Sequence, residues 1–147
     1  MDILEPREIV ENVLNSKTSL HAVQSVTPTQ ELLDTFEAAG AFATLVDRAP
    51  VFDKTTLLHA LYQACRMPGY FGFNWDALES ILRDFSWLEA RAYVLVFDDF
   101  ALLNERAPEV ADTFADIVKE VNTERLVGSR PPLMVIILGR DNPETLG

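Results

Sequence analysis

The densest run of chemically informative residues lies at positions 70–76, with the sequence Tyr-Phe-Gly-Phe-Asn-Trp-Asp. Its four aromatic rings stand at a predicted loop-to-helix junction, which cannot bury all of them, so one or two are expected at the surface. Rigid aromatic side chains at a surface are typical anchors of protein–protein interfaces. The run therefore predicts binding chemistry, although for any single ring a staple that fixes the chain's entry into the helix is the simpler explanation.

Acidic residues form a second group at the ends of predicted strands, namely Asp47, Asp98, Asp99 and Asp141. Ligands of open α/β sheets bind at the carboxyl edge, and Mg²⁺ prefers one or two carboxylates plus water. The simpler interpretation is that these acids cap turns. No Lys, Ser or Thr stands at a matching strand end to complete a phosphotransfer site, so turn capping is favoured.

Candidates for a nucleophile, a base or a metal ligand are weak. Cys65 is the single cysteine, which excludes an internal disulfide and a zinc cluster, and it continues an apolar helical stripe. His21 and His59 have no neighbouring Cys, Ser or acid in a motif that would make them a base or a ligand. No nucleotide-binding or hydrolase motif is present, so we expect no metal and no cofactor.

The composition narrows the class of partner. The 147 residues include 12 Lys and Arg against 23 Asp and Glu, a net charge of −11, and 48% are hydrophobic. Such a chain buries a real core, and its acidity argues against binding nucleic acid through phosphates and favours a cationic partner. No signal peptide or membrane-length apolar run is recognised, so we expect a cytoplasmic protein without a membrane partner. The oligomeric state is left open.

The hydrophobic pattern alternates between helices and strands. Helices are predicted at residues 6–15, 28–39, 53–65, 74–84 and 108–123, and strands at 42–47, 92–97 and 133–138, with a doubtful fourth strand at 20–26. The strands at 92–97 and 133–138 are apolar throughout, as expected of central parallel strands covered on both faces. The predicted fold is α/β, with a small parallel sheet of three main strands packed with helices and a possible fourth strand from the N-terminal residues.

Several residues predict where helices begin and end. Thr27-Pro28-Thr29-Gln30 has the pattern of a capping box, and Asp53 and Asn74 are expected to be N-caps. Gly40 is expected just past the end of the helix that starts near residue 28. The polar residues 140–147 are expected to fray.

The run YFGFNWDAL at residues 70–78, between a short amphipathic helix and an apolar strand, resembles the barstar family of small ribonuclease inhibitors. The resemblance continues through the strand at 92–97, the sequence VKEV at 118–121 and the closing strand LMVIIL-Gly139, and covers about residues 41–139. It implies a barstar-like domain at 41–147, preceded by a helical extension at 1–40.

In that family, the helix after the motif, the loop before it and the last helix plug the ribonuclease active site. Carried over residue by residue, the resemblance implies partner contacts at Tyr70, Phe71, Asn74, Trp75, Asp76, Glu79, Ser80, Trp87 and Glu120. The pairing of Trp87 is loose because two extra residues intervene, and a solvated helix surface also explains Glu120. The family's dominant aspartate aligns with Ser80, which has no charge, and the adjacent Glu79 is spaced to pair with Arg83.

Three functions follow in order of preference. The first is a non-enzymatic inhibitor that blocks a cationic ribonuclease or related toxin with an acidic and aromatic surface. The second is a barstar-fold regulatory or scaffold module for a non-nuclease protein, which Ser80 and residues 1–40 motivate. The third is a Mg²⁺-dependent enzyme or phospho-switch that uses the strand-end aspartates.

Overall fold

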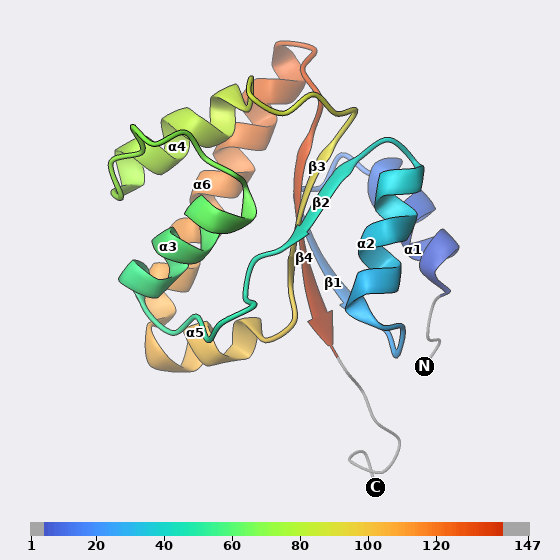
Figure 1. Ribbon diagram of the computed structural model, residues 1–147, viewed down its shortest axis with the longest axis horizontal. Helices are drawn as coiled ribbons and strands as arrows, with labels where there is room; N and C mark the ends of the chain where they lie inside the picture. Colours follow the sequence, from blue (N-terminus) through green and yellow to red (C-terminus); the bar gives the residue numbers. More distant parts are fainter. Residues whose placement is uncertain (1–4, 140–147) are drawn as a thin grey trace, which may run out of the picture.

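A four-stranded, entirely parallel sheet lies between two layers of helices in the computed structural model, which describes residues 5–139 (Figure 1). The strands, in chain order, are β1 (Leu20–Gln24), β2 (Phe42–Leu45), β3 (Tyr93–Phe97) and β4 (Leu133–Gly139). Their order across the sheet is β1-β4-β3-β2. The predicted α/β class and parallel sheet are confirmed, and the N-terminal residues supply the fourth strand.

The two central strands contribute side chains to both helical layers. Along β3, Tyr93, Leu95 and Phe97 belong to one buried cluster, whereas Val94 and Val96 belong to the other. This alternation is the period of a strand whose two faces are both covered. The prediction from the apolar runs is therefore confirmed.

Four helices cover the first face of the sheet: α3 (Lys54–Ala64), α4 (Trp75–Asp84), α5 (Phe100–Arg106) and α6 (Pro108–Val127) (Figure 1). The sequence did not predict α5, because its seven residues bury only Phe100 and Leu103 and its N-terminus has no side-chain cap. Helix α6 begins at Pro108 as expected but continues to Val127 instead of ending at residue 123.

The N-terminal residues cover the second face with α1 (Pro6–Leu14) and α2 (Thr29–Ala38) (Figure 1). Ile9 and Phe36, on these two helices, are 1% and 0% exposed and pack in one cluster with sheet residues such as Val94. Helix α2 ends as predicted, because Gly40 follows it with a φ of +90°, which a residue with a side chain rarely adopts.

The capping box predicted at residues 27–30 is wrong. Helix α2 starts one residue later than expected, after Pro28, and no side chain caps its N-terminus. The Thr29 hydroxyl, at the first position of α2, donates a hydrogen bond to the carboxylate of Asp98, with an O···O distance of 2.9 Å. This contact joins the start of α2 to the residue that follows β3.

The remaining differences concern the ends of elements. The strands β1 and β2 end at Gln24 and Leu45, two residues before the predicted ends at 26 and 47. The predicted fraying at 140–147, and with it Asp141, lies outside the described residues. Within residues 5–139, no helix has the length and apolar character needed to span a membrane.

Candidate partner-binding surface

Helix α4 begins at a well-defined cap. Asn74 is extended, with φ −142° and ψ 170°, and its side-chain oxygen accepts a hydrogen bond from the backbone N–H of Ala77 at 2.8 Å. The amide nitrogen of the same side chain donates to the carbonyl of Gly72 at 3.2 Å. The predicted cap is confirmed, and it joins the loop before α4 to the first turn of the helix.

The aromatic residues of the loop divide into exposed and packed rings. Tyr70 is 76% exposed and Phe73 is 37% exposed, whereas Phe71 is only 4% exposed, which confirms that one or two rings remain at the surface. The Phe73 ring lies 4.5 Å from His59 and 4.8 Å from Phe71, centroid to centroid. Tyr70 is thus the most accessible ring of the run, and Phe71 offers a partner little area.

Trp75, the remaining aromatic residue of the run, is half-buried at the first position of α4. The Nζ atom of Lys54 lies 5.1 Å from the centre of its ring, in the range of a cation–π contact. The indole therefore packs against the first turn of α3 and keeps part of its surface accessible.

Acidic side chains from α4 and α6 lie close together in the helical layer formed by α3 to α6. The carboxylates of Glu79, Glu120 and Glu124 each provide an oxygen within 4.8 Å of the others. Asp76 and Ser80 are exposed on α4, one helical turn apart. We call these five residues the α4–α6 surface.

Arg83 neutralises part of the charge on the α4–α6 surface. Its guanidinium donates to Glu79 at 2.7 Å and also binds Glu124, which confirms the predicted pair with Glu79 and adds a contact to α6. The hydrogen bond to Glu124 is the largest cause that raises the pKa of Arg83. Arg83 pairs with two of the three clustered carboxylates, so the cluster keeps an excess of negative charge.

Glu124 is a member of the carboxylate cluster that the sequence did not predict. It follows Glu120 by four residues and therefore lies on the same side of α6, which is the one local signal that pointed to it. Its closeness to Glu79 depends on how α4 packs against α6, which no local pattern specifies.

Trp87, the loosely aligned residue, has a packing role. Its indole N–H donates to the carbonyl of Cys65 at 2.9 Å, and its ring stacks on Phe85 with centroids 5.1 Å apart. Cys65 and Phe85 are the C-caps of α3 and α4, so these contacts lie at the end of α4 opposite to Asn74. Burial also raises the pKa of the Cys65 thiol to about 12, consistent with the predicted structural cysteine.

A buried arginine, which the sequence reasoning also missed, joins α4 to α6. Arg125 is 2% exposed and donates to the carbonyls of Arg83 and Pro131, both at 2.7 Å. Its guanidinium carbon also lies 5.0 Å from the centre of the Tyr93 ring. Desolvation is the main cause that lowers its pKa. Arg125 thus satisfies carbonyls at the C-terminal end of α4 and holds that helix in place.

The strand-end aspartates take part in turns. The carboxylate of Asp47 accepts the backbone N–H groups of Asp98 at 2.9 Å and Asp99 at 2.6 Å, and burial raises its pKa. Asp98 in turn accepts from Thr29. Within the described part of the chain, no group of three acidic side chains with mutually close oxygens includes these aspartates. The geometry matches turn capping, the interpretation favoured from the sequence.

The sequence was compared with models of known protein families. A family model described as "Barstar (barnase inhibitor)" matches residues 41–136. The match includes α3 to α6 and every predicted partner contact, and it begins after α1, β1 and α2. No curated protein matches the chain.

Proposed function

Because the chain belongs to the barstar family, whose model spans residues 41–136 of its 147, we propose that it inhibits a cationic ribonuclease or related toxin by binding over the active site. On this proposal it is a binding protein and performs no catalysis. The family is described by its inhibition of barnase, and the chain's own target is the new element of the proposal.

The observation that carries the proposal is the exposed ring of Tyr70, four residues before the cap of α4, the helix that bears Asp76 and Glu79. An accessible ring stands at the start of a capped helix that also presents Asp76. A ribonuclease active site holds phosphate and is therefore cationic, so carboxylates on rigid helices can occupy it in place of the phosphates. The net charge of −11 adds long-range attraction that speeds the encounter.

The serine at position 80 changes how the negative charge is supplied. Ser80 is exposed one turn after Asp76 and directly follows Glu79, which belongs to the α4–α6 carboxylate cluster. We propose that Glu79, Glu120 and Glu124 partly replace the missing aspartate. Because Arg83 shares their charge, the replacement is incomplete, and the chain is expected to bind a barnase-type enzyme more weakly than a relative with aspartate there.

A titration of barnase with the full chain, followed by RNA cleavage, tests the proposal. We expect stoichiometric inhibition at low salt that weakens as the salt concentration rises. Tyr70→Ala and Asp76→Asn should each weaken inhibition at least tenfold, which is about 1.4 kcal/mol. Glu31→Gln is the matched control, because it removes one exposed charge from α2 on the opposite face of the sheet.

The possible outcomes distinguish an error in the proposed binding surface from a failure of the inhibitor proposal itself. If the chain inhibits but both Tyr70→Ala and Asp76→Asn inhibit normally, the proposed surface is wrong. If the unaltered chain neither inhibits nor binds a ribonuclease, the inhibitor proposal itself fails. Ser80→Asp should strengthen inhibition of barnase, whereas the uncharged Ser80→Asn should not, because only the aspartate restores the carboxylate.

A second candidate is a regulatory or scaffold module that uses the same surface for a non-nuclease protein. Ser80 favours it, because the position that dominates inhibition in the family carries no charge here. The additional layer formed before residue 41 favours it as well, because it lies outside the family match. Affinity capture with the unaltered chain and with Tyr70→Ala distinguishes the two: a tight partner that depends on Tyr70 and is not a nuclease supports the module.

A further inference from the structure

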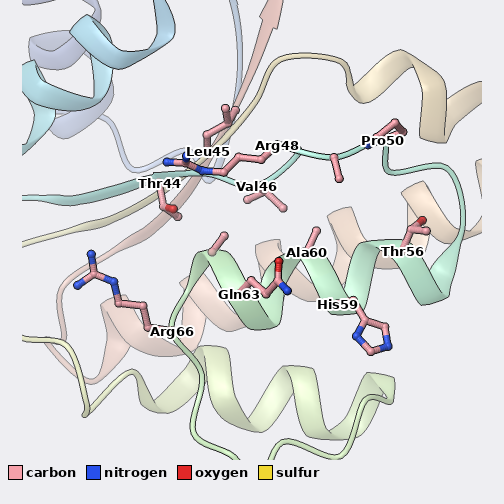
Figure 2. Close-up of a pocket in the computed structure, with 12 residues that line it drawn as sticks. Thr44, Leu45, Val46, Arg48, Pro50, Thr56, His59, Ala60, Gln63 and Arg66 are labelled. Atoms are coloured by element: carbon pink, nitrogen blue, oxygen red, sulfur yellow. The ribbon is translucent and has the colours of Figure 1, made fainter.

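A groove lies between strand β2 and helix α3 (Figure 2), and no residue of the α4–α6 surface lines it. Its volume is about 520 Å³, which is within the range of ligand-binding sites. Residues from the β2 side include Thr44, Leu45 and Arg48, and residues from the α3 side include Ala60, Gln63 and Arg66. We call it the β2–α3 groove.

One wall of the β2–α3 groove is the edge of the sheet. Strand β2 is last in the strand order and pairs with β3 alone among the described strands. The backbone N–H groups of Phe42 and Val46 donate to Ala92 and Val96 at 2.9 and 2.8 Å, so this alternate set of backbone groups faces β3. The intervening set, at Ala43 and Leu45, therefore points away from β3; Leu45 lines the groove, whereas Ala43 is buried. Such an edge is a template for another strand.

The charge of the groove is opposite to that of the molecule. None of the twelve residues that line it is an aspartate or a glutamate, although the whole chain carries a net −11. Arg48 extends along β2 toward Leu45, and Arg66 lies beyond the end of α3 (Figure 2). Within residues 5–139, neither arginine forms an ion pair with a carboxylate. An anionic segment in the groove would supply these partners.

We propose that the β2–α3 groove binds an extended acidic segment of a partner protein, which adds to the sheet beside β2. The backbone of the segment would pair with the N–H and carbonyl of Leu45, and its carboxylates would pair with Arg48 and Arg66. A second copy of this chain is a poor occupant, because pairing two β2 edges would bring the arginines of both copies together. The groove shares no residue with the proposed inhibitory surface, so this inference does not depend on the inhibitor function.

The direct test is an NMR titration of the ¹⁵N-labelled full chain with a blocked hexapeptide of alternating glutamate and valine. We expect shifts of the amide signals at residues 43–48 and slower hydrogen exchange at Leu45, because its N–H group gains an acceptor. A peptide with proline in place of the central valine should bind at least tenfold more weakly, because proline donates no hydrogen bond. Equal binding of the two peptides would overturn strand addition.

Charge exchange tests the role of the arginines. The double substitution R48E/R66E should weaken binding of the glutamate–valine peptide at least tenfold and should create binding of a lysine–valine peptide. The matched control R7E/R106E reverses two other exposed arginines and should leave both affinities unchanged. The gain of lysine–valine binding shows that the altered chain is folded.

Three further results would contradict the proposal. One is unchanged binding of the glutamate–valine peptide by R48E/R66E, and another is the absence of amide shifts at residues 43–48 at millimolar peptide. The third is loss of peptide binding in Tyr70→Ala, because it would place the peptide on the inhibitory surface and not in the groove.

Discussion

The two helical layers differ in what they present to solvent. The layer formed by α1 and α2 packs on the sheet through Ile9, Val13 and Phe36, but none of the predicted partner contacts lies on it. The layer formed by α3 to α6 carries Tyr70, the α4–α6 surface and one wall of the β2–α3 groove. The family match begins at residue 41, after the first layer, so the features proposed for recognition lie with the family-matched layer.

The central strands make the two layers interdependent. Val94 and Val96 of β3 face α1 and α2, and Tyr93 and Leu95 of the same strand face α3 to α6. All four side chains are at most 4% exposed. The N-terminal layer is therefore expected to contribute stability to the strand that supports the recognition layer, and five predictions follow from this division.

The largest effect is expected from deleting residues 1–40. The deletion removes β1 from its pairing with β4 and uncovers the apolar side of the sheet at Val94, Val96, Met134 and Ile136. We expect residues 41–147 alone to unfold or aggregate, as measured by circular dichroism and size-exclusion chromatography. If this fragment folded with the melting temperature of the full chain, the layers would be independent and the boundary at residue 40 would separate two domains.

The milder substitution Phe36→Ala tests the same layer in the intact chain. Its ring is fully buried between α2 and the sheet, so the loss of unfolding free energy should be about 3–5 kcal/mol. Inhibition by the molecules that remain folded should be unchanged.

The next effect concerns the support of α4. Replacing the guanidinium in Arg125→Met leaves the carbonyls of Arg83 and Pro131 without this buried donor, and we expect a loss of about 3 kcal/mol in urea unfolding. Arg130→Ala is the matched control, because Arg130 is exposed and donates to the same carbonyl of Arg83. The control should lose about 0.5 kcal/mol or less. If Arg125→Met lost no more unfolding free energy than the expected small loss of the control, the buried guanidinium would not be needed to hold α4.

A smaller effect is expected at the cap of α4. Asn74→Ala removes the acceptor for the N–H of Ala77 and should cost about 1 kcal/mol, whereas Asn74→Asp should retain most of the stability. Asn104→Ala, an exposed change within α5, controls for loss of an amide side chain. If the cap positions the binding loop, Asn74→Ala should also weaken inhibition while Asn104→Ala does not.

The smallest effect concerns the pH dependence of stability, which should have opposite signs at two aspartates. Hydrogen bonding by the Thr56 side chain is the main cause that lowers the pKa of Asp53 in the folded state. The ionised Asp53 therefore stabilises the fold above the ordinary pKa of 3.8, and this stabilisation is lost as pH falls through the folded-state pKa. Burial raises the pKa of Asp47, so the folded state holds its proton more tightly and stability decreases as pH rises through the window above 3.8.

Urea unfolding from about pH 3 to pH 6 measures both contributions. Asp53→Asn keeps a cap-forming side chain and should reduce the loss of stability on the acid side. Asp47→Asn should remove the decrease in stability that the raised pKa of Asp47 causes as pH rises. For each variant, the difference in unfolding free energy from the unaltered chain is plotted against pH. If the two plots had slopes of the same sign, the opposite pKa shifts assigned to Asp53 and Asp47 would be contradicted.

Short-range features were predictable because a few adjacent residues determine them. Asp53 and Asn74 cap their helices as expected, Pro108 begins α6, and Gly40 follows α2 with a positive φ. The apolar runs at 92–97 and 133–138 likewise identified the central strands. In each case, backbone geometry or burial constrains the residue type at the position itself.

Features that depend on distant partners were not predictable in the same way. The Thr29 hydroxyl binds the carboxylate of Asp98, which is 69 residues away, and no local pattern indicated this contact. Arg125 is an arginine within a helix, which is ordinarily exposed, yet it is buried because carbonyls at the end of α4 and beside β4 surround it.

The sequence by itself determined the fold class, the family and the aromatic run at the start of α4. Only the tertiary structure decided which rings are accessible, that Glu124 joins Glu79, and that β2 is the last strand of the sheet, beside a groove with two arginines. The physical reason is that periodicity specifies which side of an element is buried, whereas the packing of helices and the order of strands determine which exposed groups become neighbours.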